Sequence, residues 1–337
     1  SCPIYKAWWV LPLSSAVAFI HYTERYTTIE KSSVTHKTSS QAYIMLTFVT
    51  WGWGCNAIFS KVAVDQISPM MLVSLRWLTV LMVLSIVSHR QVVKDWLVIR
   101  QHLLYFALMG TIGFTLFNAL YYAAAHTTSA INIGIIQGSI PVFVFLGSYL
   151  FLRTRITVLQ MLGASVTLIG VVVVATKGEF SQLKGLAFNL GDLFMLIACF
   201  FYAIYSVGLT RRPKISPLSL FTLFSGFAFL ASLPLWIIEI QYQGLQAPTT
   251  TGWIIVALVA LLPSLLSQLL FIHAVGLVGP GRSGMFVNLV PIFASVMAVF
   301  YLGEQFENFH AVALGLVLCG IFLAEFGKGS TIKATTR

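Results

Sequence analysis

Ten apolar stretches, most close to twenty residues long, follow one another along this chain and decide what it can fold into. They span residues 43–62, 69–88, 103–124, 129–151, 158–176, 190–209, 218–238, 252–274, 281–302 and 309–326. An α-helix of about 20 apolar residues crosses a hydrocarbon core of roughly 30 Å. Because lipid offers no hydrogen-bond partners, each stretch must satisfy its own backbone groups, so we expect ten transmembrane helices.

The composition excludes a water-soluble protein and a nucleic-acid-binding one. Only 9% of the residues are charged and 58% are hydrophobic, whereas a soluble domain carries about 25% charged residues. The net charge of +10 comes from basic residues scattered in short loops, not from a basic stretch with interleaved aromatic residues. We therefore expect the lipid bilayer as a partner and no nucleic acid.

The basic residues also predict the orientation of the chain. With the N-terminus inside the cell, fifteen lysines and arginines fall on the cytoplasmic side of the ten helices and three fall on the other side. Cytoplasmic loops carry an excess of these residues. This bias favours cytoplasmic termini, an even number of helices and a multi-pass location in the cytoplasmic (inner) membrane.

The two halves of the chain resemble each other. Five residue pairs recur at a spacing of 150: Ala124/Ala274, Pro141/Pro291, Phe143/Phe293, Leu152/Leu302 and Gly170/Gly320. Residues 67–69 recur at 215–217, a spacing of 148. Because five helices is an odd number, the second copy enters the membrane from the opposite side, as in many secondary transporters. The fold we expect is therefore all-α, with two inverted five-helix repeats at residues 43–176 and 190–326.

The chain outside the repeats has no predicted function. Residues 1–42 form an N-terminal extension whose apolar part is too short to span a bilayer, and residues 327–337 form a cytoplasmic tail. No predicted helix depends on the extension. We expect its deletion to leave membrane insertion intact.

A proline interrupts the fourth helix of each repeat, at Pro141 and Pro291. Proline lacks a backbone N–H and bends a helix, which frees carbonyl groups near the membrane midplane. Paired interruptions of this kind indicate a central binding site. The alternative that these prolines only set helix packing stays open.

These motifs together resemble the drug/metabolite transporter superfamily, and its EamA-like members in particular. The similar segments are Trp51-Gly52-Trp53-Gly54-Cys55-Asn56 with Lys61, Ser68-Pro69 with Arg76-Trp77, the Tyr/Ala…Pro segments that lead to Pro141 and Pro291, and Leu302-Gly303-Glu304. The first repeat departs from the pattern, because Leu152-Arg153-Thr154 stands where Leu-Gly-Glu is expected. The resemblance implies a ten-helix carrier that moves metabolites or amino-acid-like solutes, commonly outward.

Arg76 is the most unusual residue within the predicted helices. A charge in hydrocarbon is expensive, so such residues face the bundle interior or a cavity. Its planar guanidinium suits a carboxylate or a phosphate of a substrate. A structural role, in which Arg76 binds backbone carbonyls or extends to the interface, is equally compatible with the sequence.

Other polar side chains lie near the predicted midplane, and they complete the candidate substrate site. Asn118 and Gln268 are again 150 residues apart, so both repeats place an amide at one position. The full predicted site comprises Trp53, Asn56, Arg76, Asn118, Tyr122, Gln137, Gln268 and Asn288. Ser139, Ser264 and Ser267 lie at similar depth. Each of these residues alone is also compatible with hydrogen bonding between helices, worth about 1 kcal/mol.

The remaining charged residues lie near the ends of the predicted helices. Asp192, Glu239, Glu304 and Glu325 are of this kind, and we expect Lys61 to reach the interface. No carboxylate occupies the centre of a predicted helix, so the sequence leaves ion coupling undecided.

We expect a carrier and not an enzyme. The sequence contains no His-Glu-x-x-His, no Gly-x-Ser-x-Gly and no phosphate-binding Gly-x-x-x-x-Gly-Lys-Ser/Thr motif. We accordingly predict no catalytic residues, no metal and no cofactor. The alternatives are a membrane-embedded channel or scaffold, and then an intramembrane enzyme. The expected partner is a small polar molecule, and both a monomer and a homodimer stay open.

Overall fold

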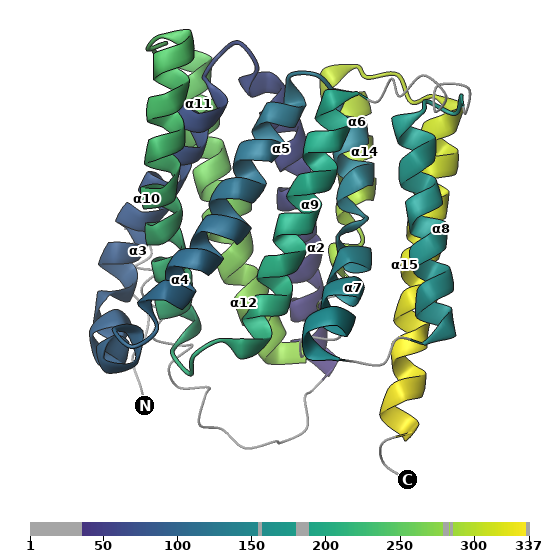
Figure 1. Ribbon diagram of the computed structural model, residues 1–337, viewed down its shortest axis with the longest axis horizontal. Helices are drawn as coiled ribbons and strands as arrows, with labels where there is room; N and C mark the ends of the chain where they lie inside the picture. The colour runs from purple at the N-terminus through teal and green to yellow at the C-terminus, as the bar shows by residue number, and fades with distance from the viewer. Residues whose placement is uncertain (1–35, 154–156, 180–188, 279–282, 284–285, 335–337) are drawn as a thin grey trace, which may run out of the picture.

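The computed structural model describes residues 36–153, 157–179, 189–278, 283 and 286–334, and these residues form a bundle of helices without a strand (Figure 1). The first repeat contains α2 (His36–Ala63), α3 (Pro69–Ile99), α4 (Leu103–Gly110), η1 (Thr111–Leu116), α5 (Phe117–Ala125), α6 (Ala130–Gln137), α7 (Ile140–Leu152) and α8 (Val158–Ala175). The second contains α9 (Leu190–Gly208), η3 (Leu209–Arg211), α10 (Pro217–Gln243), α11 (Thr250–Val259), η4 (Ala260–Leu266), α12 (Ser267–Val278), α14 (Val290–Leu302) and α15 (Asn308–Ala334).

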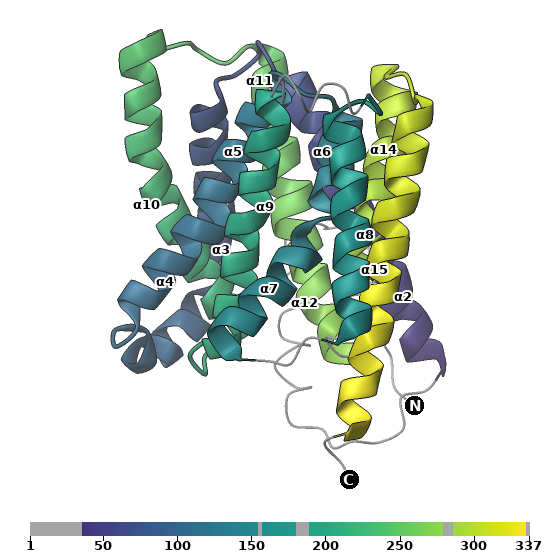
Figure 2. The same cartoon turned by 45° about the vertical axis from the view of Figure 1, so that its right-hand side comes forward.

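The predicted ten-helix membrane architecture is confirmed. Eight continuous helical segments in the described part of the chain are long and apolar enough to cross a membrane, and two shorter apolar helices, Val290–Leu302 and Asn308–Ala324, supply the ninth and tenth. The helix α2 begins at His36, before the predicted start at residue 43. The start of α2 and the end of α15 lie at the same face of the bundle, the lower one in Figure 1 and Figure 2.

Side-chain caps set where several of the helices begin. A helix leaves its first four N–H groups without intrahelical partners, and a preceding Ser, Thr or Asn side chain satisfies one of them. Ser129, Asn189, Ser216 and Thr249 accept such hydrogen bonds at the starts of α6, α9, α10 and α11. Thr157 and Gln160 form a reciprocal capping box at α8.

The repeats match in their irregularities as well as in their helices. The third helix of the first repeat contains a π-helical segment, η1, and the corresponding helix of the second repeat contains η4. Such segments widen one turn of a helix and are frequent at functional sites. The proline inside η4, Pro263, removes a hydrogen-bond donor, whereas η1 contains no proline. Neither segment was predicted from the sequence.

The fourth helix is interrupted in each repeat, but the prolines act differently from the prediction. In the first repeat α6 ends at Gln137 and α7 begins at Ile140, so the break precedes Pro141. Pro141 and Pro291 both lie in the first turn of the following helix, α7 or α14. An N–H in that turn has no intrahelical partner in any case, so proline starts these helices without losing a hydrogen bond.

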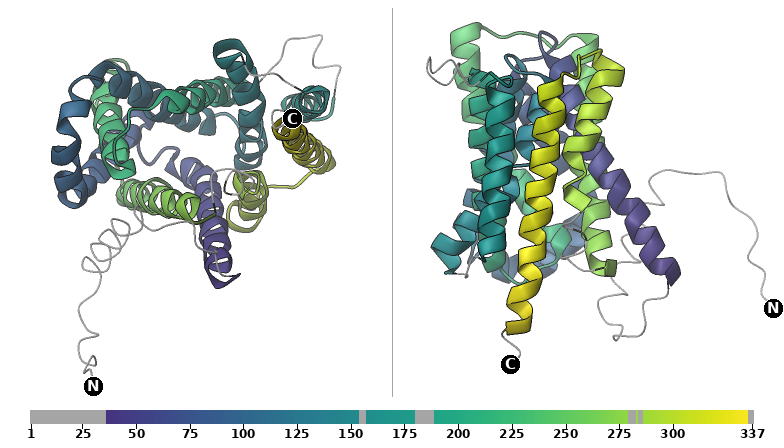
Figure 3. Two further views of the ribbon diagram at one scale, coloured as in Figure 1. Left: turned by 90° about the horizontal axis from the view of Figure 1, so that it is seen from below. Right: turned by 90° about the vertical axis from the view of Figure 1, so that its right-hand side faces the viewer.

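Two helices at the edge of the bundle, α8 and α15, pack against each other closely. They lie side by side in Figures 1 and 2, and the view from below in Figure 3 shows them at the periphery. A Cβ atom added at Gly163 would lie 2.4 Å from the carbonyl oxygen of Gly320, so only glycine permits this approach. Small residues of this kind bring backbones together in membrane proteins.

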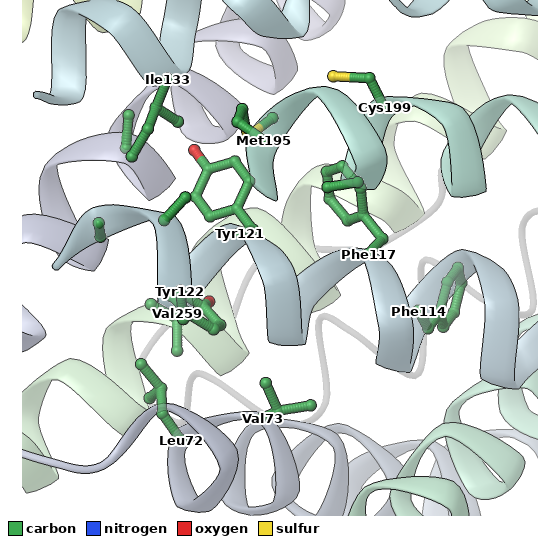
Figure 4. Close-up of a cluster of buried hydrophobic side chains, with 14 of the residues drawn as sticks. Leu72, Val73, Phe114, Phe117, Tyr121, Tyr122, Ile133, Met195, Cys199 and Val259 are labelled. Carbon is green, nitrogen blue, oxygen red and sulfur yellow. The ribbon is translucent and has the colours of Figure 1, made fainter. Parts of the chain in front are cut away.

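The described core includes residues of both repeats, and part of it lies between α5 and α9. Figure 4 shows Tyr121 and Phe117 on the side of α5 that faces Met195 and Cys199 of α9. Tyr121 and Met195 are almost wholly buried. These apolar contacts hold α5 in place, and α5 carries two residues of the predicted site, Asn118 and Tyr122.

Candidate functional site

Arg76 lies on α3 and is buried, with 6% of its surface exposed. Its Nε donates to Ser264 Oγ at 2.6 Å. Its Nη1 donates to Asn118 Oδ1 at 2.6 Å and to Tyr122 Oη at 2.5 Å. All three partners are neutral, and no carboxylate of the described residues hydrogen-bonds to this cation. A guanidinium has five N–H groups, so the two on Nη2 have no described partner.

Aromatic rings flank the Arg76 guanidinium. Its Cζ lies 5.0 Å from the ring centroid of Trp77 and 5.8 Å from that of Tyr122. The negative face of an aromatic ring attracts a cation at such distances. Trp77 is held in turn by Phe114, with ring centroids 4.6 Å apart and nearly parallel planes. The rings therefore offset part of the desolvation of Arg76 without neutralising its charge.

The hydrogen bonds around Arg76 have a defined direction. Tyr122 Oη accepts from Arg76 and donates to Asn56 Oδ1 at 3.1 Å. Asn118 donates from Nδ2 to the carbonyl of Phe114 at 2.6 Å, which leaves its Oδ1 facing Arg76. Four predicted site residues, Asn56, Arg76, Asn118 and Tyr122, thus form one network from α2, α3 and α5.

The second repeat contributes to this network through η4. Ser264 accepts from Arg76 and donates to the carbonyl of Val259, five residues earlier, at 2.5 Å. The carbonyl of Pro263 accepts from Trp53 Nε1 at 3.0 Å. Trp53 also packs against Phe271, with ring centroids 5.3 Å apart. The π-helical segment therefore binds two first-repeat side chains, and the site lies across the two repeats.

Three predicted site residues do not join the network. Gln137, Gln268 and Asn288 are half-buried, and their side chains make no hydrogen bond to the described residues. Gln137 ends α6, and Asn288 lies in the turn before α14. Gln268 lies at the start of α12, directly after η4. The three amides keep their hydrogen-bonding capacity for another partner.

Three groups around Arg76 and Trp53 lie outside the predicted site: the Ser264 hydroxyl, the Trp77 ring and the Pro263 carbonyl. Ser264 was recognised as a polar residue at the right depth, and the serine that follows an intrahelical proline was the available signal. Trp77 appeared only as part of the Arg76-Trp77 motif. The carbonyl of Pro263 had no side-chain signal, because its role depends on the geometry of η4.

Carboxylates near the helix ends bind the N-termini of other helices. Asp95, near the end of α3, accepts from the backbone N–H of Ser216 at 2.9 Å, just before α10. Reciprocally, Glu239, near the end of α10, accepts from the N–H of Met70 on α3 at 3.2 Å. Negative charge is favourable at a helix N-terminus. The repeat-related helices α3 and α10 are therefore tied to each other at both faces.

Lys61, which we expect to reach the interface, has two backbone partners at one face of the bundle. Its Nζ donates to the carbonyls of Ala125 and Thr128, at 2.6 and 2.9 Å. Those carbonyls lie at the end of α5 and in the turn that follows it. A lysine there satisfies acceptors that the helix leaves without partners.

Comparison with known proteins identifies the family. The model of the EamA-like transporter family matches twice, at residues 40–176 and 189–326, in close agreement with the predicted repeats. The chain is 26% identical to the uncharacterized transporter YyaM of Bacillus subtilis over 84% of this chain and 93% of YyaM. It is 25% identical to an uncharacterized transporter of Archaeoglobus fulgidus over 85% of this chain and 97% of that protein.

A solved crystal structure shares the fold. It superposes with a TM-score of 0.58 at 16% identity, over 85% of this chain and 96% of that one. The paired family matches, the relatives and the apolar helices agree with one another. The chain belongs to the EamA-like transporter family and is a multi-pass membrane transporter.

Proposed function

We propose that this protein is a secondary carrier of small polar solutes that bear a negatively charged group, such as amino-acid-like metabolites. The observation that carries this proposal is Arg76: a buried cation held by Ser264, Asn118 and Tyr122, none of which is charged. Burying an unpaired charge is unfavourable, and an anion within reach compensates for it. The Nη2 group, which has no described partner, is available to a carboxylate or phosphate oxygen.

Alternating access is the mechanism that fits this arrangement. The two repeats are inverted, and the network joins them through Arg76 on α3 and Ser264 on η4. When one repeat rocks against the other, a site at their junction faces each side of the membrane in turn. The half-buried amides Gln137, Gln268 and Asn288 are the remaining groups that we assign to the solute.

We further propose a location in the cytoplasmic membrane, with both termini inside and net movement of solute outward. The excess of Lys and Arg in the loops of one face supports this orientation. Thr127→Cys and Lys94→Cys should then react with an impermeant thiol reagent from opposite sides of the membrane. Reaction of both from one side would contradict the orientation.

Transport in proteoliposomes tests the function. The panel contains matched pairs of labelled solutes: lactate and lactamide, glutamate and glutamine, glycerol 3-phosphate and glycerol. We expect saturable flux of at least one anionic member, with little flux of its neutral partner, and exchange against unlabelled solute on the far side. Flux of neutral solutes alone would overturn the anionic class, and absence of any flux would argue against the carrier.

A further inference from the structure

The turn between α5 and α6 is held by side chains from three other elements. Lys61 of α2 binds the carbonyls of Ala125 and Thr128. Asp192 of α9 accepts from the hydroxyl of Thr128. Glu304, in the segment after α14, accepts from the N-terminus of α6. We call residues 125–131 the 125–131 hairpin; it lies at the upper face of the bundle in Figure 1.

Glu304 makes the most specific of these contacts. Its two carboxylate oxygens accept from two successive backbone N–H groups, those of Ala130 at 2.8 Å and Ile131 at 3.0 Å. Both N–H groups belong to the first turn of α6, where they have no intrahelical acceptor. The negative charge also interacts favourably with the helix dipole. The bond forms only while α6 and the end of α14 stay together.

The backbone before Glu304 directs the carboxylate to this place. Gly303 ends α14 in the left-handed region, with φ of 66°. Its repeat partner, Arg153, ends α7 in the same conformation, with φ of 52°. The two repeats thus share the turn, although a non-glycine residue adopts this conformation at some expense in free energy.

The residue after this turn differs between the repeats. Glu304 corresponds to position 154, which is threonine. Thr154 lies outside the described residues, but its chemistry is fixed by the sequence: it has no carboxylate. Position 154 therefore offers no carboxylate equivalent to that of Glu304.

We propose that the two hydrogen bonds of Glu304 to α6 hold the carrier closed at the face of the 125–131 hairpin. We call this contact a latch. Because Thr154 provides no equivalent carboxylate in the first repeat, the conformation closed at the hairpin face is the more stable one. The inference rests on the proposed alternating access, since it concerns the relative stability of the two conformations. Opening that face requires α6 to separate from the end of α14, which breaks both Glu304 hydrogen bonds. At the opposite face, position 154 has no carboxylate that could form equivalent bonds.

Distances between spin labels test the latch without any substrate. Labels at His126→Cys and Asn308→Cys, both exposed positions, are placed in a full-length background whose four native cysteines are replaced. We expect one short-distance population in the parent protein. In Glu304→Gln a second, longer population should appear, because the amide lacks the charge and can accept with only one oxygen. Loss of a charge-assisted pair corresponds to roughly a tenfold change in the population ratio.

Two further variants separate a latch from a merely structural contact. Glu239→Gln removes another carboxylate from a helix N-terminus at the same face, on α3, and should lower thermal stability without producing the longer distance. Thr154→Glu adds the missing carboxylate to the opposite repeat and should increase the longer population while Glu304 is intact.

The outcomes are distinct from those of the transport test. An unchanged distance distribution in monodisperse Glu304→Gln overturns the latch, even if the protein transports. Equal effects of Glu304→Gln and Glu239→Gln on the distances also overturn it. A protein whose distances respond as expected but which carries no solute keeps the latch and loses the proposed transport.

Discussion

The environment of Arg76 and that of its repeat partner, Phe224, differ completely in chemistry. The second helices of the two repeats match at a spacing of 148 residues, so Arg76 corresponds to Phe224. The third helices match at a spacing of 150 residues, so Ser264 corresponds to Phe114. Arg76 hydrogen-bonds to Ser264, and Phe224 packs edge-on against Phe114 with ring centroids 5.8 Å apart. The same helix–helix contact is polar in one place and aromatic in the other.

The two repeat-related contacts therefore differ in their groups: the contact at Arg76 contains a charge and hydrogen bonds, and the contact at Phe224 contains packed rings. Around Phe224 the neighbours are Phe106, Tyr205 and Phe114, a cluster of rings in edge-on and tilted arrangements. Such packing stabilises a bundle, and unlike the contact at Arg76 it contains no charged group that could bind an anion. Both contacts join the two repeats, and in the proposed function only the contact at Arg76 supplies groups that bind an anion. Matched substitutions at the two places separate these roles.

The largest effect is expected at Arg76. Arg76→Gln removes the charge and Arg76→Lys keeps it without the planar fork, so flux per folded molecule should fall in the order parent, Lys, Gln. Loss of a charge-assisted contact of about 2–3 kcal/mol corresponds to roughly a 30- to 140-fold loss for Gln. Flux is normalised to purified, monodisperse protein.

Phe224→Leu is the control for Arg76. It should lower the melting temperature through a loss of about 1 kcal/mol of packing and leave normalised flux within about twofold of the parent, a factor equivalent to roughly 0.4 kcal/mol. Unchanged normalised flux in Arg76→Gln would remove Arg76 from the site. The residues around Arg76 and those around Phe224 would then both serve only to pack the helices.

A smaller effect is expected at Tyr122. Tyr122→Phe keeps the ring beside Arg76 but removes the hydroxyl that accepts from Arg76 and donates to Asn56. Two buried polar groups then lose a partner, which corresponds to roughly a tenfold loss of flux. Tyr205→Phe is the control, because the hydroxyl of Tyr205 has no hydrogen bond to a described residue and its ring packs on Phe224. Equal losses in both variants would contradict the distinction.

The sequence was sufficient to predict the helices and their duplication, because both depend on local patterns. Apolar length determines each span, and residues 67–69, Pro141 and Pro291 recur at fixed spacings. The break near Pro141 was predicted in the right region, but its cause was predicted wrongly. The helix breaks at the Gly138-Ser139 turn, and Pro141 lies in the first turn of α7, which follows.

The contacts across the bundle were beyond prediction, because they depend on how the helices are rotated. Asn56, Arg76, Asn118 and Tyr122 were selected by polarity and depth, and the structure joins them. Gln268 met the same criteria and has no hydrogen bond to a described residue. The π-helical geometry of η4, which turns Ser264 and the Pro263 carbonyl toward the first repeat, has no local sequence pattern that identifies it.

The smallest effect is expected at Ser264, the one side chain among the described second-repeat residues that hydrogen-bonds to Arg76. Ser264→Ala removes a neutral acceptor from Arg76 Nε and a donor from the Val259 carbonyl, and a loss of about 0.7 kcal/mol predicts roughly a threefold decrease in flux. Ser225→Ala is the control, since Ser225 is equally buried but donates only to Phe221 within α10. If Ser264→Ala abolishes flux as fully as Arg76→Gln does, Ser264 must itself bind the solute or control the shape of η4. If it has no effect, the second repeat contributes nothing to Arg76 through this contact, and the site belongs to the first repeat alone.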